Sequence, residues 1–123
     1  MNSNSPIYYK GPERRRHKRF PFKFKVLFSR DRDKNFMLSD SGNIGYGGIR
    51  FYSDIPFSGK DTVCIKIIYS GGKHEKILLI DAQVVWVEEM AGINKKFFSV
   101  GAQFLNLSQT QKKTLKTIIS NIV

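Results

Sequence analysis

The alternation of apolar and polar residues in short segments is the feature that most restricts how this chain can fold. The segment from Phe22 to Phe28 alternates with a period of two residues until Leu27, which is typical of a strand with one buried face. Short turns rich in glycine, proline and charge separate further strand-like segments, some of them alternating and others, such as 62–69, rich in β-branched and aromatic residues. No helical pattern lies between them. Six strands are expected, at residues 22–28, 36–44, 49–52, 62–69, 76–87 and 97–105.

The same alternation predicts which side chains face inward. In 22–28 the even-numbered residues are expected to point to the core, and in 97–105 the inward set is Phe98, Val100, Ala102 and Phe104. Segment 76–87 is long for one strand, so a bend or bulge is expected near Asp81. Within that segment Ala82, Val84 and Trp86 are expected to share one face, and a loop is expected from Glu88 to Lys96.

The period changes at the end of the chain. Ser108 and Gln111 form a capping box, in which the serine caps the first turn and the glutamine reaches back. Leu115, Ile118, Ile119 and Ile122 then recur at helical spacing. The prediction is an all-β domain with one helix at 108–122, the strands forming an antiparallel barrel or sandwich.

Length and composition favour a single domain in a reducing compartment. The chain has 123 residues, 41% of them hydrophobic and 13% aromatic, which suits one folded domain. No apolar run is long enough to cross a bilayer, no secretory signal pattern is present, and the single cysteine is Cys64, so a cytoplasmic protein is expected. Residues 1–13 are expected to form a flexible leader, followed by a domain at 14–123 with its strands in 20–105.

The balance of charge indicates an anionic partner. Lys and Arg number 21 against 10 Asp and Glu, a formal net charge of +11. Nucleic acid, an anionic membrane surface and a small phosphorylated ligand all fit this charge. Much of it is concentrated between Lys10 and Lys25, where Glu13 is the single acid.

The sequence offers few residues in a pattern that would support catalysis. His17 and His74 are the two histidines, neither has a neighbouring catalytic motif, and both are expected at the surface. Cys64 is expected to be a small buried apolar residue, and the acids show no metal-ligand spacing. The chain is therefore interpreted as a binding protein and not an enzyme, without a catalytic residue, metal or cofactor.

Two motifs carry the case for binding. Arg14, Arg15 and Arg19 lie in a basic cluster whose guanidinium groups suit phosphate oxygens and guanine edges, although such a cluster alone also fits a solubilising tail or a nucleic-acid arm. The segment Asn43 to Gly48 can be a plain hairpin turn in which glycine supplies positive φ. It can equally offer backbone N–H groups and the Asn43 amide to a ligand.

Taken together, these motifs resemble the PilZ domain, the bacterial receptor module for cyclic di-GMP. Arg15-Arg16-His17-Lys18-Arg19 is similar to the family's R-x-x-x-R motif, and Asn43 to Gly48 to its D/N-x-S-x-x-G motif. Ala82 to Trp86 resembles the family's late strand, and Val100 to Phe104 the strand before its terminal helix. The likeness covers about residues 13–120 and implies a six-stranded antiparallel β-barrel with a C-terminal helix.

The resemblance also implies a ligand and a site. Arg15 and Arg19 would grip phosphates and guanine edges, and Arg14 would add charge or stacking. Asn43 would bond a guanine edge, Gly45 and Gly48 would line the site, and Trp86 would lie near it, although a lone strand tryptophan is more often a core residue. The implied role is a second-messenger receptor, for example in motility or biofilm regulation. Its leader would become ordered on the ligand and present a new surface to a downstream protein partner. A homodimer is a further possibility under this resemblance.

One departure from the family pattern leaves alternatives. Gly45 stands where the family usually has serine, so a hydroxyl that helps hold the ligand is missing. One alternative is therefore an interaction module of the same fold that has lost the nucleotide. The other is a basic β-barrel that binds RNA or single-stranded DNA, which the clustering of the arginines in one leader disfavours.

Overall fold

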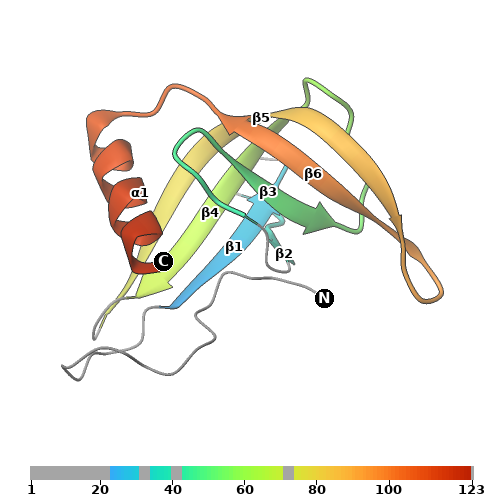
Figure 1. Cartoon of the computed structure of the whole chain (residues 1–123), viewed down its shortest axis with the longest axis horizontal. Coiled ribbons are helices and arrows are strands. Elements are labelled where there is room, and N and C mark those ends of the chain that lie inside the picture. The colour runs from blue at the N-terminus through green and yellow to red at the C-terminus, as the bar shows by residue number, and fades with distance from the viewer. Residues whose placement is uncertain (1–22, 31–33, 40–42, 71–73, 123) are drawn as a thin grey trace.

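A single curled sheet and one helix make up the structure (Figure 1). It is a computed structural model that describes residues 23–30, 34–39, 43–70 and 74–122. The strands run antiparallel in the order β2-β1-β4-β5-β6-β3. Their bounds are β1 Lys23–Ser29, β2 Met37–Ser39, β3 Gly48–Ser53, β4 Thr62–Ser70, β5 Glu75–Ala91 and β6 Lys96–Phe104. The prediction of six antiparallel strands followed by a helix is confirmed.

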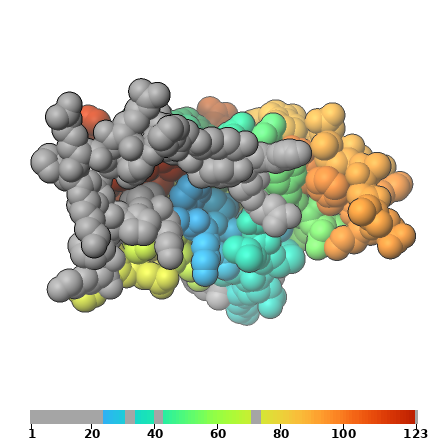
Figure 2. Space-filling model, turned by 60° about the horizontal axis from the view of Figure 1, so that its bottom comes forward, coloured from blue at the N-terminus to red at the C-terminus, as the bar shows by residue number. Residues whose placement is uncertain are grey.

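The two edge strands of this half-barrel approach each other without forming a ladder in the described residues. The backbone N–H of Tyr52 in β3 donates to Oγ of Ser39 in β2 at 2.9 Å. Ser39 is buried, so this hydrogen bond lies inside the contact between β2 and β3 and not on the solvent-exposed surface. In Figure 2 the strands β1, in blue, and β2, in teal, lie together, and the hairpin that joins β5 to β6, in orange, projects at one end.

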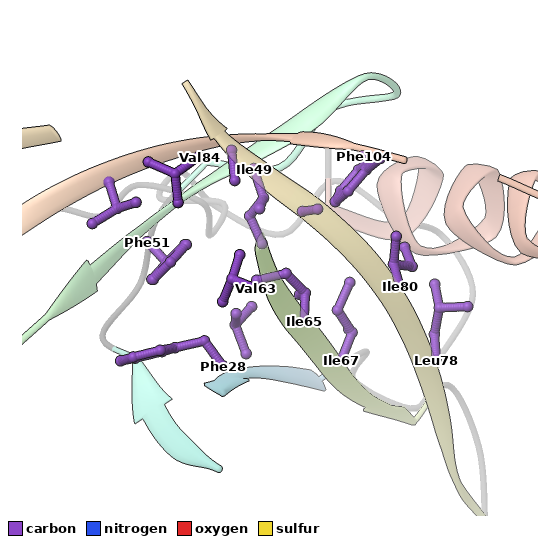
Figure 3. Close-up of a cluster of buried hydrophobic side chains, with 14 of the residues drawn as sticks. Phe28, Ile49, Phe51, Val63, Ile65, Ile67, Leu78, Ile80, Val84 and Phe104 are labelled. Atoms are coloured by element: carbon purple, nitrogen blue, oxygen red, sulfur yellow. The ribbon is translucent and has the colours of Figure 1, made fainter. Parts of the chain in front are cut away.

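The core fills the concave side of the sheet (Figure 3). Phe28, Phe51 and Phe57 form an aromatic cluster, with ring centroids 4.8–5.9 Å apart. Aliphatic residues of the central strands, such as Ile65 and Ile80, continue the core toward the helix. The inward faces predicted for the first and last strands are correct for the described residues, since Val26, Phe28, Val100, Ala102 and Phe104 are buried and Phe24 and Phe98 pack against the core. Phe22, also predicted to face inward, lies outside the described residues.

The helix α1, Gln109–Ile122, covers one end of the core. The capping box is present: Gln111 N–H donates to Ser108 Oγ at 3.0 Å, and Ser108 N–H donates to Gln111 Oε1 at 2.7 Å. Gln111 Nε2 also donates to the carbonyl of Leu79 at 2.8 Å, which ties the first turn of the helix to β5. Leu115 and Ile118 are buried, and Ile119 and Ile122 pack against the core, as predicted.

Two strand boundaries differ from the predictions. The second strand was predicted over 36–44, but β2 spans Met37–Ser39, and Ile44 makes an isolated bridge to Ile49 instead. The loop predicted from Glu88 to Lys96 is much shorter, because β5 continues to Ala91 and β6 begins at Lys96. Pairing with β6 keeps this polar stretch extended, and an exposed ion pair joins Lys96 to Glu89 at 3.2 Å.

Candidate functional site

The glycine-rich segment forms a narrow hairpin that leads into β3. Ile44 pairs with Ile49, the N–H of Arg50 donates to the carbonyl of Asn43 at 2.7 Å, and Gly45 N–H donates to the carbonyl of Gly48 at 2.9 Å. No glycine among the described residues has a positive φ. The expectation that glycine serves this turn through positive φ is therefore wrong, and the glycines have another reason to be here.

Close packing supplies that reason at Gly48. A Cβ on this residue would lie 2.4 Å from the carbonyl oxygen of Ala102 in the neighbouring strand. The N–H of Phe104 also donates to the carbonyl of Gly47 at 2.9 Å. The hairpin is thus held against the end of β6 at a separation that a larger residue at 48 would prevent.

A register shift in β5 determines where the tryptophan lies. Val84 pairs with Ala102 and Trp86 pairs with Gly101, so Val85 is an extra residue on β5. An extra residue reverses the alternation of faces beyond it. Val84 is buried, Val87 packs against the core, and Trp86 is 43% exposed. The prediction that Ala82, Val84 and Trp86 share a face is wrong for Trp86, and the bulge lies beyond the predicted position near Asp81.

Trp86 lies against the backbone of β6 on the face opposite the core. A Cβ on Gly101 would be 2.2 Å from Nε1 and 2.3 Å from Cε2 of the indole. The indole therefore occupies space that a side chain at 101 would need. A core role for the tryptophan, the commoner role of a strand tryptophan, does not apply.

The hairpin and the bulge together border a pocket. Its volume is about 380 Å³. The lining residues come from the hairpin, β3, β5 and β6: Asn43, Ile44, Gly45, Gly48, Ile49, Arg50, Val85, Trp86, Gly101 and Ala102. Segments about half the chain apart in sequence thus meet at one place on the outside of the sheet.

Several predicted site residues are brought together here. Asn43, Gly45, Gly48 and Trp86 all line the pocket. Asn43 is exposed, so its amide is accessible from solvent. Gly45 has open space on its side-chain side, where a Cβ would meet nothing closer than the carbonyl of Gly48 at 4.0 Å. Arg14, Arg15 and Arg19 lie outside the described residues.

Sequence reasoning missed Arg50 and Gly101. Arg50 projects opposite to the buried Ile49 and Phe51, and its Nε is buried without a hydrogen-bond partner in the described part of the chain. Its guanidinium carbon lies 5.8 Å from the centroid of the Tyr52 ring. Two features of the sequence could have identified these residues. The alternation in 49–52 predicts that Arg50 points away from the core, and a glycine within a strand, such as Gly101, indicates that a neighbouring group approaches closely.

Two of the remaining reactive residues, His74 and Cys64, lie where they were predicted. His74 is exposed, Cys64 is buried, and His17 lies outside the described residues. Among the residues whose positions are described, no three His, Cys, Asp or Glu side chains gather as a metal site would require. None of the helical structure described is long and apolar enough to span a membrane.

The curled antiparallel sheet, the helix over one end and the pocket on the outer face define a small β-domain. The model of the PilZ domain family matches residues 13–121, and the chain belongs to this family. A comparison with curated protein sequences found no match.

Solved structures show the same fold. The PilZ domain of YcgR from Escherichia coli with c-di-GMP has a TM-score of 0.58 and 20% identity, covering 89% of this chain and 92% of that one. Apo MrkH of K. pneumonia has a TM-score of 0.62 and 16% identity over 90% of this chain, and its complex with c-di-GMP a TM-score of 0.56 and 17% identity over 89%. The chain spans about half the length of the MrkH chains, 52% in both cases.

Proposed function

We propose that this protein is a non-enzymatic receptor for cyclic di-GMP and that the ligand binds in the pocket beside Trp86. The observation that carries the proposal is the meeting of Asn43, Gly45, Gly48 and Trp86 at one pocket, although Trp86 is distant from the others in sequence. Membership of the PilZ family supports it, as do two similar solved structures, the MrkH–c-di-GMP complex and the YcgR PilZ domain with c-di-GMP.

The chemistry of the lining suits a purine dinucleotide. The Asn43 amide offers both donors and an acceptor to a guanine edge. The partly exposed indole of Trp86 offers a flat apolar surface on which a base can stack. The open space at Gly45 leaves room for the ligand to approach the backbone of the hairpin.

The arginine motif supplies the charge in this proposal. Arg15 and Arg19 bind phosphate oxygens and guanine edges through their planar guanidinium groups, and Arg14 adds charge or stacking. The segment that carries them closes over the bound nucleotide and so forms a new surface. A downstream protein partner recognises that surface, which makes the domain an adaptor.

Calorimetric titration of the purified protein with cyclic di-GMP tests the proposal. We expect saturable binding, and we expect GMP, which lacks the second nucleotide, to bind much more weakly. The absence of any heat at high micromolar cyclic di-GMP would reject the proposal. With the salt concentration held fixed, excess single-stranded oligonucleotide should not displace cyclic di-GMP from this pocket. A general polyanion site would release the ligand under the same conditions.

Gly45 favours a second candidate, an interaction module of the same fold that does not bind the nucleotide. The pocket has no hydroxyl at position 45, where the family motif usually has serine. This candidate predicts that a partner protein is captured equally with and without cyclic di-GMP. The receptor hypothesis predicts instead that capture of the partner protein depends on cyclic di-GMP.

A further inference from the structure

Arg50 lies across a bare glycine from the tryptophan of the pocket. It pairs with Gly101 in β6, and Gly101 pairs in turn with Trp86 in β5. Neighbouring strands are about 4.8 Å apart, so the backbones at Arg50 and Trp86 are separated by roughly 10 Å. Gly101 has no side chain to fill this interval, and the indole leans over it.

The guanidinium of Arg50 has one buried donor, Nε, that no described residue pairs with. Within the part of the chain that the structure describes, this Nε has no hydrogen-bond partner and Arg50 forms no ion pair. A buried donor without a partner is unfavourable, and a ligand acceptor would satisfy it. The ring of Tyr52, 5.8 Å from the guanidinium carbon, lies along the same face of β3 and offers the cation a favourable neighbour.

The indole of Trp86 covers Gly101, and a base stacked on the indole would present its edge to Arg50 on the neighbouring strand. Guanine has two acceptors, O6 and N7, on its Hoogsteen edge, and arginine binds both at once. Adenine has an amino donor where guanine has O6, which would face another donor. The two bases therefore differ at the edge that reaches Arg50.

We infer that Arg50 is the residue that selects guanine over adenine at this pocket, in addition to the recognised motif residues. The inference rests on the function proposed above. It also assigns Arg50 a role that the arginine motif does not cover, because this guanidinium approaches from the sheet and not from the N-terminal segment.

The test compares cyclic di-GMP with cyclic di-AMP by calorimetry on the full chain. We expect the wild-type protein to prefer cyclic di-GMP, and Arg50→Ala to reduce that preference by about tenfold or more, as the loss of a bidentate contact implies. Glutamine binds the adenine edge, so Arg50→Gln should shift the preference further toward cyclic di-AMP. Arg30→Ala, which removes an arginine outside the pocket, is the matched control and should leave the preference unchanged.

Each outcome decides the inference. Both variants remove an unpaired buried donor and one cation–π contact with Tyr52, so their thermal midpoints should stay close to that of the wild type and both are expected to fold. If a folded variant binds cyclic di-GMP but keeps the wild-type preference, or loses affinity for both ligands equally, then Arg50 does not select the base. The proposed function stands in that case. If the wild-type protein binds both ligands equally, the inference also fails. If it binds neither, the proposed function fails and the inference fails with it.

Discussion

The indole of Trp86 occupies the space that a side chain on Gly101 would need, with Nε1 2.2 Å from the position of a Cβ at 101. These two residues are paired across β5 and β6 immediately after the bulge at Val85. The tryptophan is thus placed on the outer face by the bulge and seated there by the missing side chain of its partner. The pocket depends on both features.

Gly101→Ala should displace the indole without unfolding the domain. Trp86 is partly exposed, so its side chain can move away from the new methyl group. We expect a shift in the emission of the single tryptophan, weaker binding of cyclic di-GMP and a thermal midpoint close to that of the wild type. Gly59→Ala is the control, since a Cβ there meets nothing within 4 Å. Unchanged emission in Gly101→Ala would contradict this arrangement.

Gly48→Ala should destabilise the fold itself. The new methyl group would meet the backbone carbonyl of Ala102 at 2.4 Å, and a backbone atom inside a paired strand cannot move aside easily. Overpacking of this kind costs about 1–3 kcal/mol. Urea denaturation should show the loss. Gly47→Ala, one residue earlier and without any contact within 4 Å, should lose much less, and equal losses would argue against the role of Gly48 in strand packing.

Gly45→Ser should strengthen binding of the nucleotide. Position 45 has space for the side chain and no positive φ, so the substitution introduces no strain. It restores the hydroxyl of the family motif, and one hydrogen bond contributes about 0.5–1.5 kcal/mol, or up to roughly tenfold in affinity. Calorimetry on the two proteins measures the gain. Gly45→Ala, which adds bulk without a hydroxyl, is the control and should not bind more tightly than the wild type.

Arg15→Ala and Arg19→Ala should each weaken cyclic di-GMP binding by about 1.5–3 kcal/mol, the range for a charge-assisted hydrogen bond. The loss should exceed the general effect of removing one positive charge. Lys116→Ala, on the exposed side of α1, provides that comparison. Wild-type affinity in either arginine variant would show that the arginine does not contact the ligand.

Ser108→Ala should lower the free energy of unfolding by about 0.5–2 kcal/mol through loss of the helix cap. Gln111→Ala should also be destabilised, because it loses the bond to Ser108 and the bond to Leu79. Ser120→Ala, exposed near the end of α1, is the control and should remain close to the wild type. Denaturant titration measures all three, and an unaffected Ser108→Ala would exclude a stabilising cap.

Local patterns were sufficient to predict most of the elements. Alternation, β-branched composition and turn residues predicted six extended segments, and the capping box predicted the first turn of the helix, because all of these signals depend on residues close in sequence. The motif resemblance also identified Asn43, Gly45, Gly48 and Trp86, which the structure brings to one pocket. The short β2 and the long β5–β6 hairpin were not predicted, since pairing with a neighbouring strand determines where a strand ends.

The sequence by itself determined the residue types and their periodicity, and hence an antiparallel sheet with a terminal helix and a glycine hairpin. The tertiary structure alone decided that Val85 is the bulged residue, that Trp86 therefore faces outward, and that Arg50 and Gly101 lie beside it. The physical reason is that strand register is a relation between strands. One extra residue on β5 exchanges the two faces of the strand, and a period read along a single segment does not contain that information.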